Sequence, residues 1–227
     1  MSEASRDRET RDRLLHAAER LFAERGFKAV TVREICLAAR ANVAAVNYHF
    51  GDKLGLYREV MQAAIDAMHD ATEAARVAGE GKPPDEQLRL YIAIFLRRLL
   101  APDNESIHML ITREMSEPTP ALDVLIEQGV RPRFEYLSGV VAAILQCDRS
   151  DPRVVRSVVS VQSQSVIYAR PNRIAERMGF KLRPSGAEID ELAEHIADFS
   201  IAGVRALARR RQPTVVGRQS SGLTTDD

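Results

Sequence analysis

The 227-residue sequence contains no tryptophan, only two cysteines, and only 10 prolines and 12 glycines. Few prolines or glycines interrupt the long segments, which favours helices over sheet. Cys36 and Cys147 lie far apart and lack the spacing of metal ligands, so we expect free thiols in a reducing compartment and no disulfide framework. Neither a metal site nor a cofactor is predicted.

The sequence also lacks an excess of charge, because 32 Lys and Arg residues balance 32 Asp and Glu residues. A nucleic-acid-binding protein of this composition must concentrate its basic groups locally. No apolar run is long enough to span a bilayer, and the polar N-terminal residues do not resemble a signal peptide. We therefore expect a cytoplasmic protein with no membrane partner.

Apolar residues recur at helical spacing along most of the chain, which predicts an all-α fold. The first helix is expected to end at Gly26. Thr31 and Glu34 form a capping box that predicts the start of a second helix. Asn42 and Asp52 are predicted N-caps of a third and a fourth helix.

A break at residues 79–84 separates these helices from a longer helical region. Proline lacks the backbone N–H of a helix interior, so Pro132 predicts a bend. Asp151 followed by Pro152 predicts an N-cap and a first-turn proline, and Ser185 with Glu188 predicts another capping box. The further predicted helices span about 85–100, 103–115, 119–146, 151–168 and 185–211.

Residues 31–50 predict two short helices joined by a tight turn, an arrangement that fits a DNA groove. At the start of the second helix, Val43, Ala44 and Ala45 are small enough to contact bases and thymine methyl groups. Arg33 can bind guanine in bidentate fashion, and Asn42 can bind a base or phosphate unless its capping role occupies the oxygen. Phosphate contacts, which fix orientation, are expected from Thr31, Tyr48, His49 and Lys53.

Each of these residues, taken alone, also fits an ordinary structural role. Val43 and Ala45 could pack in the hydrophobic core, Tyr48 could cover the edge of that core with its ring, and Lys53 could be an ordinary solvated surface residue. The eleven basic and nine acidic residues of positions 1–60 add little electrostatic support. DNA binding is indicated by the set, in which the caps, the turn and the polar tip occur together.

Residues 11–61 contain a set of short motifs that are specific when they occur together. They are Ala17-Ala18, Leu21-Phe22, Gly26-Phe27, Thr31-Val32-Arg33-Glu34-Ile35, Asn47-Tyr48-His49-Phe50, Lys53 and Leu56-Tyr57. With this set, the region resembles the DNA-binding domain of the TetR/AcrR family of transcriptional regulators. The resemblance implies a sequence-specific homodimeric regulator, usually a repressor, that leaves a palindromic double-stranded DNA operator when a small-molecule effector enters its C-terminal domain.

The sequence departs from this family pattern at the turn, where Arg40-Ala41 replaces the usual Gly-Val. Arg40 is therefore expected to adopt the left-handed conformation, at a cost of about 1 kcal/mol, or to add a phosphate contact. Asn47 stands where many family members carry a tyrosine, and we include it among the expected DNA contacts.

The C-terminal region resembles the CecR-like subgroup of the same family, on residues 111–114, 117–122 and 163–168. This resemblance implies an effector-responsive domain. Polar groups set in apolar helices are typical of ligand sites, although satisfied structural polarity or ion pairs also explain them. The candidate ligand-binding residues are His108, Met109, Arg113, Glu114, Gln162 and Tyr168.

We accordingly predict a three-helix helix-turn-helix DNA-binding domain at residues 1–55, joined by a long helix to a larger domain. That helical effector-binding and dimerisation domain covers residues 56–211, and residues 212–227 are predicted to be a disordered tail. Small residues on the helix that begins at Asp151 favour close helix packing, so this helix and the last one are candidates for the dimer interface. Packing within one subunit is the alternative.

Other functional classes fit the sequence less well. It contains no nucleophile-elbow, phosphate-loop or zinc-protease motif, so we do not predict an enzyme. A thiol-based redox-sensing regulator that uses Cys36 or Cys147 is one alternative function. A helical protein–protein adaptor that does not bind DNA is another.

Overall fold

The computed structural model describes residues 3–169, 173–179 and 184–209, and every regular element within these ranges is helical, which confirms the predicted all-α class. The predicted tail, 212–227, lies outside the described residues. The elements are α1 (Glu3–Ala29), α2 (Val32–Ala39), α3 (Val43–Phe50), α4 (Lys53–Ala78), α5 (Pro84–Leu99), the 3₁₀ turn η1 (Pro102–Asn104), α6 (Glu105–Ser116), α7 (Leu122–Val124), the π-helix η2 (Leu125–Val130), α8 (Arg131–Leu145), α9 (Pro152–Val166), the 3₁₀ turn η3 (Ile167–Ala169), α10 (Arg173–Arg177) and α11 (Ala187–Arg209).

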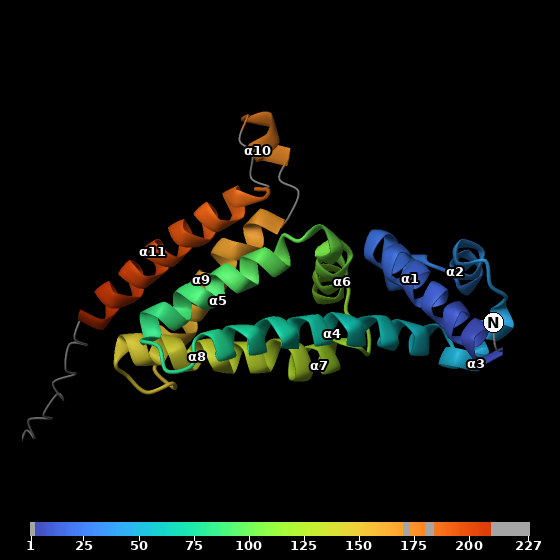
Figure 1. Ribbon diagram of the computed structural model, residues 1–227, viewed down its shortest axis with the longest axis horizontal. Helices are drawn as coiled ribbons and strands as arrows, with labels where there is room; N and C mark the ends of the chain where they lie inside the picture. The colour runs from blue at the N-terminus through green and yellow to red at the C-terminus, as the bar shows by residue number, and fades with distance from the viewer. Residues whose placement is uncertain (1–2, 170–172, 180–183, 210–227) are drawn as a thin grey trace, which may run out of the picture.

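The molecule is elongated, with α1, α2 and α3 gathered at one end (Figure 1). We call these three helices, residues 3–50, the head, and the described part of residues 84–209 the body. The long helix α4 runs from the head along the body, and α6 lies between the two, in contact with both α1 and α4. Helices α5, α8, α9 and α11 pack together at the opposite end.

Side-chain caps start the helices around the predicted DNA-binding tip, and all three predicted N-caps are confirmed. The Thr31 hydroxyl accepts from the Glu34 amide, while the Glu34 carboxylate accepts from the Thr31 amide at 2.8 Å, which completes a capping box. Asn42 Oδ1 accepts from the Ala45 amide at 2.8 Å. Asp52 Oδ1 accepts from the amide of the third residue of α4 at 2.7 Å. Each bond satisfies an N–H group that a helix end leaves free.

Two residues with positive φ shape the turns of the head. Gly26 has φ 80° and ψ 162°, so the regular part of α1 ends there, as predicted. Arg40 closes α2 in the left-handed conformation with φ 52° and ψ 46°, which confirms the expectation from its replacement of glycine. For a residue with a side chain this conformation costs about 1 kcal/mol.

Buried apolar residues form two clusters. The first unites the head with the first half of α4, where the Phe22 and Tyr57 rings meet edge-on at 5.0 Å, and extends to Leu110 of α6 and Leu125 of η2. The second begins at Ala75 and contains buried residues of α5, α8, α9 and α11. The head therefore shares its core with α4, α6 and η2.

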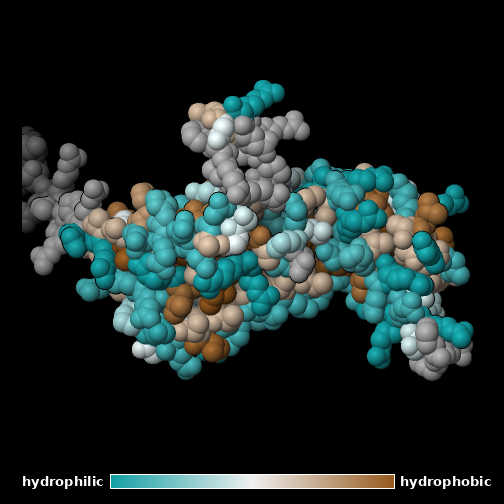
Figure 2. Space-filling model, turned by 45° about the horizontal axis from the view of Figure 1, so that its top comes forward, coloured by the Kyte–Doolittle hydropathy of each residue, from teal (hydrophilic) through white to brown (hydrophobic). Residues whose placement is uncertain are grey.

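The predicted irregularity near Pro132 is the π-helix η2, which ends just before α8 begins. Gly129 of η2 lies so close to α4 that a Cβ atom there would be 3.2 Å from Met68 Sδ. No helix in the described ranges is both long and apolar enough to cross a membrane. Figure 2 shows a largely hydrophilic face on which hydrophobic residues gather in separate patches.

Candidate nucleic-acid interface and ligand cavity

Helix α3 turns one face to the core and the other to solvent. Val46 is fully buried against the first cluster, whereas Val43 and Tyr48 are 43% and 77% exposed. Ala44 and Asn47 are exposed beside them, and Ala45 is half-buried against the core. An exposed valine and tyrosine next to small and amide side chains form a surface suited to base methyl groups and phosphates.

Helix α2 contributes a second exposed row. Arg33 is exposed and forms no ion pair with any described residue, so its guanidinium is available to a partner. Leu37, one turn later, is 81% exposed, and Arg40 follows it at the end of the helix. Sequence reasoning did not include Leu37 among the contact residues, although its spacing of four from Arg33 places both on one helical face.

Thr31 is occupied by the cap of α2. Its hydroxyl donates to Glu34 Oε2 at 2.7 Å, and Arg25 of α1 donates to Glu34 Oε1 at 2.8 Å. The hydrogen bonds from Thr31 and then from Arg25 lower the pKa of Glu34 to about 2. The carboxylate thus stays ionised and joins α1 to α2. Asn42 likewise uses its amide oxygen for capping, which leaves its NH₂ group to bind DNA.

His49 and Lys53 lie close to other parts of the head. The His49 side chain is only 7% exposed, and its Nε2 lies 3.3 Å from Asp7 Oδ1 of α1. Lys53 Nζ lies 4.3 Å from the centre of the Phe27 ring. Burial lowers the pKa of Lys53, and the Glu34 charge opposes that shift. Lys53 is half-buried at the start of α4.

Gly55 allows α4 to start directly against the end of α3. A Cβ atom at this position would lie 1.9 Å from the carbonyl oxygen of Phe50. Backbone atoms cannot move aside as a flexible side chain can, so the absence of a side chain holds the two helices in this arrangement.

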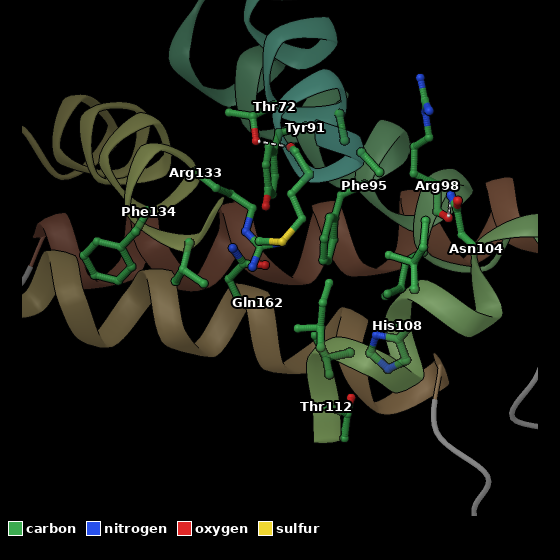
Figure 3. A pocket seen from close by; sticks show the side chains of 18 of the residues that line it. Thr72, Tyr91, Phe95, Arg98, Asn104, His108, Thr112, Arg133, Phe134 and Gln162 are labelled. Atoms are coloured by element: carbon green, nitrogen blue, oxygen red, sulfur yellow. Dashed lines mark hydrogen bonds between the residues drawn. The ribbon is translucent and has the colours of Figure 1, made fainter. Parts of the chain in front are cut away.

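A cavity of about 380 Å³ lies between α4 and the body helices α5, α6, α8 and α9 (Figure 3). This volume lies within the range typical of small-molecule sites. Its apolar lining includes Met68, Phe95, Ile107, Ile111, Val130 and Phe134, and its polar lining includes Thr72, Tyr91, Asn104, His108, Arg133 and Gln162.

The cavity brings together two of the six predicted ligand-binding residues, His108 and Gln162. Met109 does not line the cavity and packs against the first core cluster, and Tyr168 packs against the second. Arg113 and Glu114 also lie outside the lining. The reason is the rotation of α6, because the lining residues 108, 111, 112 and 115 form one stripe at helical spacing. That stripe was readable in the sequence.

Arg113 and Glu114 instead connect α6 to the head and to α4. Arg113 Nε donates to the carbonyl oxygen of Ala23 at 2.7 Å, and its Nη2 donates to the carbonyl oxygen of Glu24, near the end of α1. The buried Glu114 carboxylate accepts from the Tyr57 hydroxyl of α4 at 2.5 Å. Burial, followed by the hydrogen bond to Glu114, raises the pKa of Tyr57, so this hydroxyl keeps its proton.

Polar atoms without partners face the cavity. The Tyr91 hydroxyl, Gln162 Oε1 and Arg133 Nε are buried and form no hydrogen bond with the described residues. The Arg133 guanidinium carbon lies 5.2 Å from the centre of the Phe95 ring. Burial raises the pKa of Tyr91 to about 12, against the opposing effects of the Arg133 charge and of the nearby Gln162 side chain, which lies close to the hydroxyl without forming a hydrogen bond of full geometry. Sequence reasoning missed Tyr91 and Arg133. Arginines flank Pro132 on both sides, and only the fold shows that Arg133 lines the cavity whereas Arg131 pairs with Glu127.

The two thiols lack the environment of reactive cysteines. Cys36 is buried in the head, and burial raises its pKa. Burial, followed by the charge of Asp151, also raises the pKa of Cys147. A reactive thiol needs a lowered pKa, so neither environment supports the redox-sensing alternative.

Comparisons with known proteins agree with this arrangement. Residues 14–60 match the family model described as bacterial regulatory proteins of the tetR family, and residues 84–204 match that of the C-terminal domain of the HTH-type transcriptional dual regulator CecR. The CecR protein of Shigella flexneri is 31% identical over 156 residues, which cover 65% of this chain and 70% of that protein.

Two further relatives extend over most of the chain. The HTH-type transcriptional repressor NicS of Pseudomonas putida is 23% identical over 203 residues, or 86% of this chain and 92% of that protein. The crystal structure of a TetR-like transcriptional regulator from Rhodococcus sp. RHA1 superposes with a TM-score of 0.65 at 18% identity, covering 86% of this chain and 95% of that one. The chain belongs to the TetR family of DNA-binding transcriptional regulators, and its C-terminal region is of the CecR type.

Proposed function

We propose that the protein is a homodimeric repressor whose two heads bind a palindromic operator and leave it when a small molecule fills the body cavity. The observation that carries the proposal is the outward-facing row of α2 and α3 side chains on a firmly capped head. The proposal of repression rests on the similarity to NicS, a transcriptional repressor, whereas CecR is a dual regulator.

In the proposed complex, α3 enters the major groove with its N-terminal residues against the bases. Val43, Ala44 and Ala45 approach base edges and thymine methyl groups, and Arg33 binds guanine. The phosphates are contacted by Asn42, Asn47, Tyr48 and Lys53, to which Arg40 adds a positive charge. Thr31 is left out of this set, because its hydroxyl and its backbone N–H both donate to Glu34.

His49 takes a positioning role in this proposal. Its imidazole lies next to Asp7 and is almost fully covered, so its Nε2 is directed into the head. The T-shaped contact of its ring with Tyr48, at 4.9 Å between centres, supports the orientation of that exposed tyrosine. Tyr48 then meets the phosphate.

Helices α4 and α6 provide the connection between cavity and head. Met68 and Thr72 of α4 and His108 of α6 line the cavity. The same two helices meet at the Tyr57–Glu114 hydrogen bond, and α6 reaches α1 through Arg113. A ligand that fits only one arrangement of these helices changes the orientation of the head, because it favours the state that it binds more tightly.

The outer face of α9 and α11 supports the proposed dimer. A groove runs between these helices, floored by Ser157, Val161 and Ser200, and Gln164 Nε2 donates to Ser200 Oγ at 3.2 Å across it. Phe199 stands 67% exposed at its edge. A Cβ atom at Gly203 would meet nothing within 4 Å, so a second helix has room to approach. Two heads set about 34–36 Å apart would read two half-sites.

The test begins with selection of an operator from a random double-stranded DNA library, followed by measurement of affinity on matched and mismatched sites. Lys53→Ala is expected to weaken binding on every sequence. Arg33→Ala is expected to cost about 1–3 kcal/mol on the matched site and little on mismatched ones. Arg149→Ala, on the body far from the head, is the control and should change neither.

Failure to enrich any sequence would contradict the proposed function. Equal losses for Lys53→Ala and Arg33→Ala on matched and mismatched sites would leave DNA binding in place and contradict only the division between phosphate and base contacts.

A further inference from the structure

We propose that the cavity selects a small, mainly apolar organic acid in its ionised form, with the carboxylate bound by Arg133 and Tyr91. This inference rests on the proposed function, in which the cavity is the effector site, and adds the chemical class of the effector. It is carried by the group of unpartnered polar atoms on one wall of the cavity.

The charge of the lining has one sign. None of the described residues that line the cavity is Asp or Glu, and Arg133 forms no ion pair within the described chain. Arg98 also belongs to the lining, but it is exposed, and Figure 3 shows its side chain directed away from the other labelled residues. Arg133 is therefore the arginine whose guanidinium faces the cavity and has no acidic partner there.

The hydrogen-bond donors at this position fit a carboxylate. A guanidinium presents parallel N–H donors that match the two oxygens of a carboxylate, and Arg133 Nε is buried with no acceptor. The Tyr91 hydroxyl, in a side chain only 2% exposed, lacks a partner as well. In Figure 3 this hydroxyl points toward the ends of the Arg133 and Gln162 side chains, and both side chains act on the pKa of Tyr91, so the three groups lie close together on one wall of the cavity.

Gln162 adds a preference beyond the carboxylate. Its unpartnered Oε1 is an acceptor, so it is satisfied by a hydroxyl or N–H group of the ligand next to the acid group. The Phe95 ring lies beneath the Arg133 guanidinium and holds it in place.

The remaining lining residues determine which hydrocarbon portion of the ligand fits the cavity. Met68, Ile107, Ile111, Val130 and Phe134 are apolar, so they favour an aromatic or branched hydrocarbon portion. A doubly charged phosphate is disfavoured, because the single guanidinium that faces the cavity would balance only one of its charges among apolar walls. An organic cation would be repelled by Arg133, and a neutral ligand would leave its charge without a partner.

The experiment measures binding of three probes of nearly equal shape to the full chain by isothermal titration calorimetry: 3-phenylpropanoate, 3-phenylpropanamide and 3-phenylpropylamine. The wild-type protein is expected to bind the carboxylate at least tenfold more tightly than the amide or amine. Arg133→Met should abolish this preference. Arg133→Lys should retain part of it, because lysine keeps the positive charge but lacks the two parallel N–H donors of the guanidinium. Tyr91→Phe should weaken carboxylate binding severalfold.

Arg98→Met is the matched control, since it removes the outward-pointing arginine of the same cavity, and it should leave the preference intact. Circular dichroism confirms that each variant is folded. Equal affinity for carboxylate and amide, no binding of the carboxylate at millimolar concentration, or an equal loss in Arg98→Met and Arg133→Met would overturn the inference. Selective binding that leaves operator affinity unchanged would support the ligand class and contradict effector release alone.

Discussion

The head presents its candidate DNA contacts from neighbouring positions of two short helices, whereas the cavity gathers its lining from five helices, α4 and four helices of the body, that span about half the chain. Side-chain caps at Thr31, Asn42 and Asp52 fix the helix ends around the DNA-binding tip. In the body, the predicted N-cap Asp151 is confirmed at the start of α9, but α5, α6 and α8 begin without a side-chain cap. The cavity that they enclose also contains buried polar atoms without partners.

The capped head and the cavity with its unpartnered polar atoms are therefore suited to different functions. A capped head with outward-facing side chains holds one shape and offers a surface to DNA. A buried polar group without a partner costs about 1–3 kcal/mol, and a ligand that supplies the partner recovers this free energy. The body is thus the region where occupancy can change the relative stability of two arrangements.

The largest expected effect comes from Phe199→Asp, which tests whether the head can act without a paired body. A carboxylate on the exposed α9–α11 face should prevent dimerisation. Operator affinity should then fall by on the order of 100-fold, because the second head no longer binds as part of the same molecule. Sedimentation equilibrium and fluorescence anisotropy measure the two changes.

Val77→Asp is the control for this substitution. Val77 is 56% exposed on α4, outside the α9–α11 face, so the same change of residue should leave both the dimer and the operator affinity intact. A dimeric Phe199→Asp protein would contradict the assigned interface.

Gly55→Ala tests the rigid contact between α3 and α4. The added Cβ atom meets the Phe50 carbonyl oxygen at 1.9 Å, so the two helices must separate. We expect a loss of about 3 kcal/mol in the free energy of unfolding, at the upper end of overpacking costs, and weaker operator binding. Urea denaturation provides the measurement.

Gly139→Ala is the matched control in the body. There the added Cβ atom meets the end of the flexible Arg149 side chain, which can move away. Its free energy of unfolding should change little. Equal losses at the two positions would show that the head is no more tightly constrained than the body.

The same difference explains how much was predictable from the sequence. The caps around the head are local, so Thr31, Asn42 and Asp52 predicted the helix ends without knowledge of the fold, and these ends are confirmed. The DNA contacts at this tip stay a prediction. The cavity depends on which helices meet and on the rotation of each. Arg113 and Glu114 were therefore expected at the ligand, although they bond to α1 and α4.

Tyr57→Phe examines the hydrogen bond that joins α4 to α6 between head and body. The change leaves the buried Glu114 carboxylate with its Thr119 donors but without the hydroxyl at 2.5 Å. A hydrogen bond to a charged group contributes about 1.5–3 kcal/mol, so we expect a loss of about 2 kcal/mol in urea denaturation.

Tyr136→Phe provides the comparison, since the Tyr136 hydroxyl donates to the neutral carbonyl oxygen of Ala75 at 3.3 Å. The free energy of unfolding of the Tyr136→Phe protein should fall by about 0.5–1 kcal/mol. If the two variants lost equal stability, the Tyr57–Glu114 bond would hold head and body together no better than an ordinary tyrosine contact.

Arg40→Gly has the smallest expected effect on stability and separates backbone strain from DNA contact within the head. Glycine adopts the left-handed conformation of residue 40 without steric cost, so the free energy of unfolding should rise by up to about 1 kcal/mol. If Arg40 contacts a phosphate, operator affinity should fall at the same time. The dependence of log affinity on log salt concentration should then become shallower by about one. Arg40→Lys, which keeps the charge and the strain, should preserve that slope. A more stable Arg40→Gly protein with an unchanged slope would show that Arg40 adds strain to the head without contacting the operator.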